Sequence, residues 1–296
     1  MTAVIDMPQA TTMLCRPRFE GANIRTWIGF KHLMYLVEEV VLQWFRDRGL
    51  GPHQLYHAHG LGLELLDVSV QLPALVEVDD EVLATIEARG RGRFVVTLHV
   101  VGGDRRSLAL RGRVTVGLIR ESGEAVRGKP VDELSEFVCK EARAPDVAPQ
   151  QPASGRAPFR WSWRARYFHC HFSDRVQHSA YVRALEAVVD RFLADRGMSI
   201  RTMLQCRGWI PVVSRARVQL VAAAHMEETI HTTFTVREII KESAFDATMN
   251  CHVERDGHLV HVATARILHG YAMSRGDRAG SLVVLDPETQ ATLIGR

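Results

Sequence analysis

Apolar residues recur at helical spacing in two segments of the chain, Phe30–Arg48 and His178–Arg196. The repeating positions are Leu33, Leu36, Val37, Val40, Val41 and Trp44 in the first segment, and Tyr181, Leu185, Val188, Val189 and Phe192 in the second. This spacing places apolar side chains on one face of an α-helix. Gly49 and Gly197 follow, and glycine readily adopts the left-handed conformation that ends a helix. The pattern predicts two long, largely buried helices.

Each predicted helix is followed by four runs that are rich in β-forming residues. The runs are Leu63–Leu72, Glu81–Ala88, Phe94–Val101 and Leu108–Leu118 after the first helix, and Val212–Val221, Thr229–Val236, Ala244–Val253 and His258–Leu268 after the second. Acidic residues or glycines separate the runs, as hairpin turns require. A helix followed by antiparallel strands is an α+β unit, so the chain is expected to hold two such units.

The two units align with each other over a long stretch. Thr26–Arg89 superposes on Asp174–Arg237 without a gap, and the alignment pairs Glu38 with Glu186. It also pairs Asp47-Arg48-Gly49 with Asp195-Arg196-Gly197, and Val70-Gln71-Leu72 with Val218-Gln219-Leu220. One offset that holds through a helix, a loop and two strands indicates an internal duplication.

A segment without periodicity lies between the two units. Ala142–Pro158 is rich in Pro, Ala, Gln and Ser, which is typical of a linker. We therefore expect an N-terminal domain at residues 1–141 and a C-terminal domain at residues 159–296, a division that suits a chain of 296 residues. Val131–Glu141, just before the linker, is predicted to form a short helix.

Composition and charge exclude several classes of protein. The apolar fraction of 46% and the charged fraction of 24% are those of a globular protein, and a net charge of +3 is too small for a nucleic-acid-binding surface. The charge still allows a phosphorylated or acidic partner. Five cysteines without a CxxC pair favour neither a disulfide framework nor a zinc ribbon, so reduced thiols in the cytoplasm are expected. We find no secretory signal at Met1–Thr12 and no apolar run long enough to span a membrane.

The segment around the start of the second helix carries a specific resemblance. Asp174-Arg175-Val176-Gln177-His178 resembles the D-x-N-Q-H segment of plant and bacterial acyl-carrier-protein thioesterases, and His178–Glu186 is similar to the H-x-N-Y-x-x-x-x-E pattern of acyl-CoA thioesterases. The asparagine of each pattern is replaced here, by Val176 and Ala180. The resemblance implies two tandem hot-dog units, each a long central helix wrapped by a curved antiparallel sheet. It further implies hydrolysis of an acyl-CoA or acyl-carrier-protein thioester, in fatty-acid or polyketide metabolism.

Hydrolysis of a thioester needs a group that delivers water and donors for the oxygen that becomes negative. Asp174 precedes the second helix and His178 occupies its first turn, where unpaired backbone N–H groups could polarise a carbonyl. We therefore predict that Asp174 activates water and His178 assists. The supporting residues are predicted to be Ser179, Tyr181 and Glu186.

The first unit is expected to hold a degenerate site. Thr26 and Phe30 stand at the positions of Asp174 and His178, so the first copy lacks both the carboxylate and the imidazole. Only the C-terminal unit is therefore predicted to be active.

Several alternatives remain open. Asp174 could simply cap the helix, His178 could be a buried turn residue, and Glu186 could bond within the core. The D-x-x-x-H spacing also suits a 3-hydroxyacyl-thioester hydratase or dehydratase, and the missing asparagines suit a non-catalytic protein that binds an acyl chain or a carrier.

No cofactor is expected. The pairs His57/His59 and His169/His171 would put two imidazoles on one strand face, but without further ligands no metal site is expected. A homo-oligomer formed through the sheets or the helices would be compatible with this fold.

Overall fold

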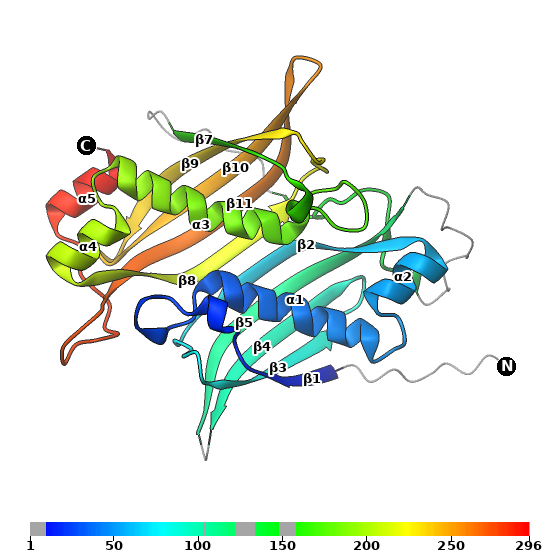
Figure 1. Ribbon diagram of the computed structural model, residues 1–296, viewed down its shortest axis with the longest axis horizontal. Helices are drawn as coiled ribbons and strands as arrows, with labels where there is room; N and C mark the ends of the chain where they lie inside the picture. The colour runs from blue at the N-terminus through cyan, green and yellow to red at the C-terminus, as the bar shows by residue number, and fades with distance from the viewer. Residues whose placement is uncertain (1–9, 103–104, 122–133, 148–157, 296) are drawn as a thin grey trace.

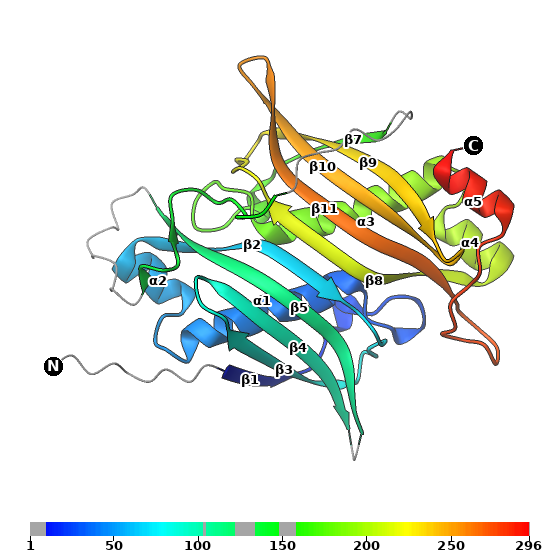
Figure 2. The same cartoon turned by 180° about the vertical axis from the view of Figure 1, so that it is seen from behind.

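The computed structural model describes residues 10–102, 105–121, 134–147 and 158–295. Two long helices, α1 (Phe30–Arg46) and α3 (His178–Asp195), lie on the same face of a curved sheet (Figures 1 and 2). The shorter helices are α2 (Pro52–His59), α4 (Ile200–Arg207) and α5 (Pro287–Ile294), with 3-10 turns η1 (Phe19–Gly21), η2 (Ile24–Thr26) and η4 (Tyr167–His169). This arrangement is a two-layer α+β fold.

Within the described ranges, eleven strands form one sheet, in the order β1-β3-β4-β5-β2-β8-β11-β10-β9-β7 with β6 beside β5. The strands of the first half are β1 (Ala10–Cys15), β2 (Leu61–Gln71), β3 (Glu81–Ala88), β4 (Arg93–Gly102), β5 (Arg105–Arg120) and β6 (Val138–Cys139). Those of the second half are β7 (Phe159–Arg164), β8 (Trp209–Leu220), β9 (Thr229–Ile240), β10 (Ala244–Arg255) and β11 (His258–Met273). Because β2 pairs with β8, the two halves share a continuous sheet.

The pairing of β2 with β8 relates the halves by an approximate two-fold axis. Ser69 pairs with Arg217, its own partner in the internal sequence alignment. On either side of this pair, Asp67 is opposite Gln219 and Gln71 is opposite Arg215, which are equivalent contacts under the same alignment. The duplication seen in the sequence is therefore present in the structure.

The loops that enter the two long helices repeat the same backbone contacts. Trp27 bridges to Glu77, as Arg175 bridges to His225. The N–H of Ile28 donates to the Val76 carbonyl at 2.8 Å, as the N–H of Val176 donates to the Ala224 carbonyl at 2.8 Å. Each long helix consequently starts at an equivalent place over the sheet.

An aromatic cluster fixes α1 to the sheet of its own half. The ring of Phe45 packs against Trp44, Phe94 and Phe137 at centroid distances of 5.0, 6.4 and 5.5 Å. Phe45 is fully buried, and burial of a side chain of this size stabilises the fold by roughly 1.5–3 kcal/mol.

The expected helices and strands are present with small differences in length. Both long helices begin at the predicted residue, and β3 has the predicted bounds. The prediction of a helix at Val131–Glu141 is wrong for the part that is described: Val138–Cys139 forms β6, because the N–H of Leu118 bonds to the carbonyl of Phe137. The beginning of that segment lies outside the described residues, as does most of the expected linker. The domain boundaries stay a prediction.

The two histidine pairs do not lie on strands as expected. His57 and His59 belong to α2, and His169 ends η4. Pro52 at the first position and Gly60 just after the end explain why α2 is a helix rather than a strand. In the part of the chain that the structure describes, no helix is long and apolar enough to cross a membrane.

Removing the Phe45 ring tests this account of the core. Phe45→Ala should lower the free energy of unfolding by about 3–5 kcal/mol, because it leaves a cavity under α1. Urea denaturation followed by circular dichroism measures this change. Phe19→Ala is a matched control, since Phe19 is 85% exposed and its loss should change stability by less than about 0.5 kcal/mol. Equal effects of the two substitutions would contradict the packing described.

Candidate active site

The start of α1 presents backbone N–H groups without partners. Gly29 is the N-cap residue, and no side chain caps the helix. In the described part of the chain, the N–H groups of Phe30 and Lys31 have no hydrogen-bond partner. The first N–H groups of a helix carry partial positive charge, so they can bind an oxygen that is becoming negative.

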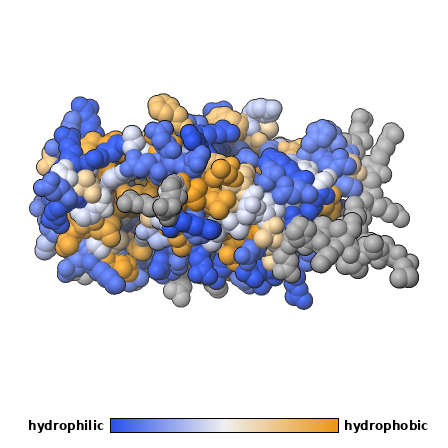
Figure 3. Space-filling view, turned by 90° about the horizontal axis from the view of Figure 1, so that it is seen from below, coloured by the Kyte–Doolittle hydropathy of each residue, from blue (hydrophilic) through white to orange (hydrophobic). Residues whose placement is uncertain are grey.

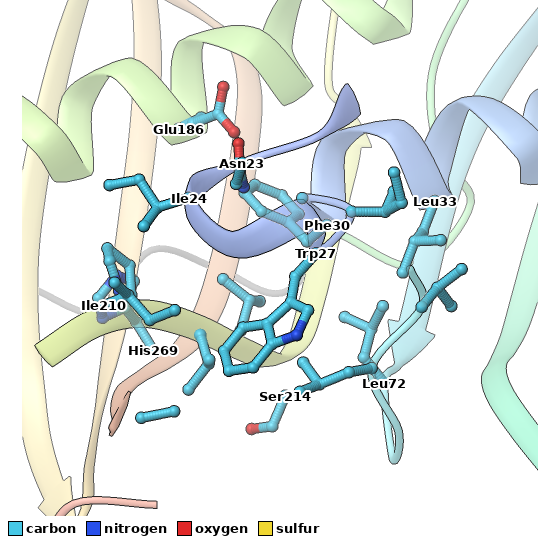
Figure 4. Close-up of a pocket in the computed structure, with 18 of the residues that line it drawn as sticks. Asn23, Ile24, Trp27, Phe30, Leu33, Leu72, Glu186, Ile210, Ser214 and His269 are labelled. Atoms are coloured by element: carbon cyan, nitrogen blue, oxygen red, sulfur yellow. The ribbon is translucent and has the colours of Figure 1, made fainter. Parts of the chain in front are cut away.

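A cavity of about 570 Å³ opens beside this helix start, which we call the α1 cavity (Figure 4). It lies between the loop that enters α1, the middle of α3, and strands β8 and β11. Most of its lining is apolar: Ile24, Trp27, Ile28, Phe30, Leu33, Leu72, Leu75, Val76, Val189, Ile200, Ile210, Val212, Val213, Ile267 and Leu282. The cavity can therefore hold a hydrophobic group next to the helix start.

The entrance to the α1 cavity is also apolar. Ile24, Leu75 and Leu282 line it and are 43%, 45% and 61% exposed. Hydrophobic side chains appear in patches among hydrophilic ones on the lower face of the molecule (Figure 3). Exposed apolar side chains at a cavity are typical of a site that receives an apolar ligand.

Helix α3 contributes two carboxylates to the wall of the α1 cavity. Glu186 and Asp190 are one helical turn apart and both line it. The Nζ of Lys31, in the first turn of α1, lies 2.6 Å from Oε2 of Glu186. This ion pair connects the start of one long helix to the middle of the other.

The carboxyl of Asp190 has an altered proton affinity. Burial, followed by the neighbouring charge of Glu186, raises the pKa of Asp190 to about 6. A carboxylate with this pKa is mostly ionised at neutral pH and accepts a proton more readily than an ordinary one. Asp190 is therefore suited to act as a general base.

The equivalent position at the start of α3 holds a buried ionic cluster instead of an apolar lining. Glu64 on β2 is fully buried, and its carboxylate accepts hydrogen bonds from Nε of Arg175 at 3.0 Å and from His171 at 3.2 Å. Arg175 also donates to the carboxylate of Glu121, which is buried too. We call these four residues the α3 cluster.

Substitutions between the two halves account for this difference. Under the internal alignment, Arg175 and Glu64 of the α3 cluster correspond to Trp27 and Val212, which line the α1 cavity. Gly62 allows the cluster to pack, because a Cβ there would overlap the carboxylate of Glu121; its counterpart is Ile210. The same scaffold thus supports an apolar cavity at one helix start and paired charges at the other.

Asp174 and His178 do not line the α1 cavity. Asp174 lies in an exposed loop, where Nδ1 of His225 is 3.1 Å from its carboxylate. His178 is the first residue of α3 and is buried, and its Nε2 donates to the carbonyl of Val218 at 3.2 Å. Burial lowers the pKa of His178 to about 4, so its imidazole is neutral at neutral pH. The catalytic roles of both residues stay predictions.

The supporting residues lie in different places. Ser179 and Tyr181 are buried in the first turn of α3; Arg183 donates to the hydroxyl of Ser179 at 3.4 Å, and Tyr181 packs edge-on to Trp163. Of the five residues selected from the sequence, only Glu186 lines the α1 cavity.

Asp190 was not selected from the sequence, although a signal for it exists. The internal alignment places Asp190 opposite Leu42, so a carboxylate has replaced an apolar residue on a core helix. A carboxylate that replaces an apolar residue beside a cavity marks a candidate functional position. The comparison of the two copies could therefore have found it.

Comparisons with known proteins identify the fold and the family of the second half. Residues 159–292 match the model of the thioesterase-like superfamily. The fold is similar to that of the 12:0-ACP thioesterase from Umbellularia californica, with a TM-score of 0.63 at 12% identity over 89% of this chain and 98% of that one. It is also similar to an acyl-ACP thioesterase from Bacteroides thetaiotaomicron, with a TM-score of 0.56 at 14% identity over 88% of this chain and 98% of that one. No curated protein matches this chain significantly. The chain therefore has the double hot-dog fold, and its residues 159–292 match the thioesterase-like superfamily.

Proposed function

We propose that this protein hydrolyses an acyl thioester of coenzyme A or of an acyl carrier protein, and that the reaction takes place in the α1 cavity. One observation carries the proposal: the start of α1, where the N–H groups of Phe30 and Lys31 have no partner among the described residues, adjoins a mostly apolar cavity that Phe30 and Asp190 both line. These are the groups that thioester hydrolysis requires. The family of the C-terminal half supports the reaction type.

The proposed reaction adds water to the acyl carbonyl. The carbonyl oxygen binds at the start of α1, and Asp190 takes a proton from water as the water oxygen bonds to the carbonyl carbon. The N–H groups of Phe30 and Lys31 stabilise the negative oxygen of the tetrahedral intermediate. The carbon–sulfur bond then breaks, and the proton passes from Asp190 to the leaving thiolate. The products are a free acid and a thiol.

The Lys31–Glu186 ion pair has a positioning role in this proposal. It joins the helix that supplies the donors to the helix that supplies the base, across an apolar cavity. Both side chains are partly buried, so the pair is less screened by solvent than a surface pair. Loss of the pair would let the two helices adjust independently, which misplaces donors and base by small but costly distances.

The cytoplasm is the proposed location. The five cysteines are free thiols, as a reducing compartment maintains. Coenzyme A and acyl carrier proteins are both compatible with the small positive charge of the chain. A homo-oligomer stays a prediction.

Substitution of the carboxylates tests the position of the active site. Asp190→Asn should lower kcat/KM for an acyl-CoA by about 10²–10⁴-fold, because it removes the general base. Glu38→Gln is a matched control, since Glu38 occupies the position on α1 that Glu186 occupies on α3 and should leave the rate within a few-fold of the wild type. Thiol release with a chromogenic disulfide measures all rates. Loss of turnover in Asp174→Asn and His178→Ala, with full activity in Asp190→Asn, would instead locate the reaction at the start of α3.

The same assays separate the alternative functions. Loss of enoyl absorbance without thiol release would identify a hydratase, and saturable binding of acyl-CoA without turnover would identify a non-catalytic acyl-binding protein. Either result would overturn the proposed hydrolysis.

The pH dependence of the rate tests the role of Asp190. Because only the ionised carboxylate accepts a proton, kcat/KM should rise with pH and reach half its maximum near pH 6, the pKa of Asp190 in the free protein. A pH–rate profile of the purified protein measures the midpoint. A flat profile between pH 5 and about 8 would contradict this role.

The free energy of unfolding should fall as the pH rises, whereas kcat/KM should increase. Its pKa in the folded protein, about 6, is above the ordinary value of 3.8, so folding favours the protonated carboxyl. The folded state therefore loses stability as the pH rises from about 4 to about 6. Asp190→Asn should raise the free energy of unfolding at pH 7 by no more than about 1 kcal/mol, since solvent screens the partly exposed carboxyl, and should leave stability unchanged near pH 3. Thermal denaturation at the two pH values measures the difference, and destabilisation at neutral pH would show that the carboxylate is structural.

A further inference from the structure

The α1 cavity is lined by a histidine with a ring nitrogen that has no partner among the described residues. His269 on β11 lines the cavity and is 3% exposed. Its Nδ1 is buried and has no hydrogen-bond partner among the residues that the structure describes. Figure 4 shows the ring beside Ile210, on the opposite side of the cavity from Leu33 and Leu72. Burial lowers the pKa of His269 to about 3, so the neutral imidazole offers one donor and one acceptor.

A tyrosine hydroxyl without a partner lies next to it. Tyr271 is two residues further along β11, on the same face of the strand, and its ring centroid is 5.5 Å from that of His269. The side chain is fully buried, and its hydroxyl likewise has no hydrogen-bond partner within the described ranges. Burial, followed by the nearby charge of Asp190, raises the pKa of Tyr271 above its ordinary value. The hydroxyl therefore keeps its proton and remains a donor.

The fold itself does not require polar residues at these two positions. In the N-terminal half, Leu63 pairs with Leu118 and Leu65 pairs with Val116. The equivalent residues of β8 in the C-terminal half are Pro211, which pairs with Tyr271, and Val213, which pairs with His269. Val116 and Leu118 thus occupy the positions of His269 and Tyr271, and both are buried.

Unpaired polar groups in a protein interior are costly, and native structures contain few of them. Of the two, His269 lines the cavity at a position where the duplicated half is apolar, and its unpaired imidazole indicates a ligand that pairs with it. We propose that the acyl group bound in the α1 cavity carries an oxygen substituent, a hydroxyl or a keto group, that hydrogen-bonds to His269. This inference rests on the proposed function of the cavity and specifies the class of its substrate.

The chemistry of the His269 imidazole suits an oxygen substituent on an otherwise apolar acyl chain. A neutral imidazole can donate to or accept from a hydroxyl, and it can donate to a keto oxygen. An oxygen on the ligand gives the imidazole a hydrogen-bond partner, whereas a plain alkyl group leaves it unpaired. The expected preference for the oxygenated chain is on the order of 10- to 100-fold in kcat/KM.

The test compares acyl-pantetheine thioesters of one chain length with the purified full-length protein. One substrate is unsubstituted, and the others carry a hydroxyl or a keto group at successive carbons. At least one oxygenated substrate should exceed the unsubstituted one in kcat/KM by the factor given above. Hydrolysis of all substrates at equal rates would overturn the inference and leave the proposed hydrolase intact.

The variants separate a specific contact from general packing. His269→Val installs the residue of the N-terminal half, and His269→Phe keeps an aromatic ring without its nitrogen atoms; each should bring the ratio of the two rates close to one. Tyr271→Phe and Tyr181→Phe are the matched controls, because each tyrosine has a buried hydroxyl without a partner among the described residues and neither lies in the cavity lining; each should keep the ratio. A ratio that survives in both His269 variants would overturn the inference.

Binding of the corresponding free acids keeps the inference testable if the protein hydrolyses none of the substrates. Calorimetry should then show that an oxygenated acid binds more tightly than the unsubstituted acid, and that His269→Val removes the difference. No hydrolysis together with this binding preference would overturn the proposed hydrolase and support the ligand class. Equal binding of the acids, or no binding, would overturn the ligand class.

Discussion

The antiparallel pairing of β2 with β8 determines how the two halves of this molecule meet. Its register is symmetric about Ser69 and Arg217, so the two halves pack against each other in equivalent orientations. The start of α1 consequently faces the middle of α3, where Lys31 binds Glu186 across 155 residues of sequence. A shift of this pairing by one residue would turn every side chain of the joined strands to the other face of the sheet and separate the donors from the carboxylates.

The two helix starts show what a duplicated scaffold can hold at equivalent places. At the start of α3, Glu64 and Glu121 are buried around Arg175. Removal of one partner would destabilise the protein, because an unpaired charge would remain inside it. At the start of α1, Trp27 and Val212 take the corresponding positions, and the result is an apolar cavity. Divergence of a few side chains, rather than of the backbone, separates a cavity from a salt-bridge cluster. The proposed reaction uses the half-site that the motif resemblance alone would have assigned to a degenerate copy.

Local periodicity predicted the fold well, because each helix and strand buries one face. The helix at Phe30–Arg46 and the strand at Glu81–Ala88 follow directly from spacing that any one segment contains. The site could not be predicted in the same way, because its groups come from α1, α3, β8 and β11 and meet only after the halves join. The motif at Asp174 and His178 predicts a site at the start of α3 instead. Nothing in the local sequence indicates that His178 is buried against Val218. Comparison of the copies holds more information, since Asp190 stands opposite Leu42, and Tyr271 is equivalent to Leu118 through the strand register.

The location of the bound acyl group is the most direct test of this account. A crystal structure of the protein with a non-hydrolysable acyl-pantetheine thioether would show it without reliance on rates. We expect the acyl chain in the α1 cavity, with its carbonyl oxygen at the N–H groups of Phe30 and Lys31 and its carbonyl carbon facing Asp190. An acyl chain bound at the start of α3, beside Asp174 and His178, would contradict the account.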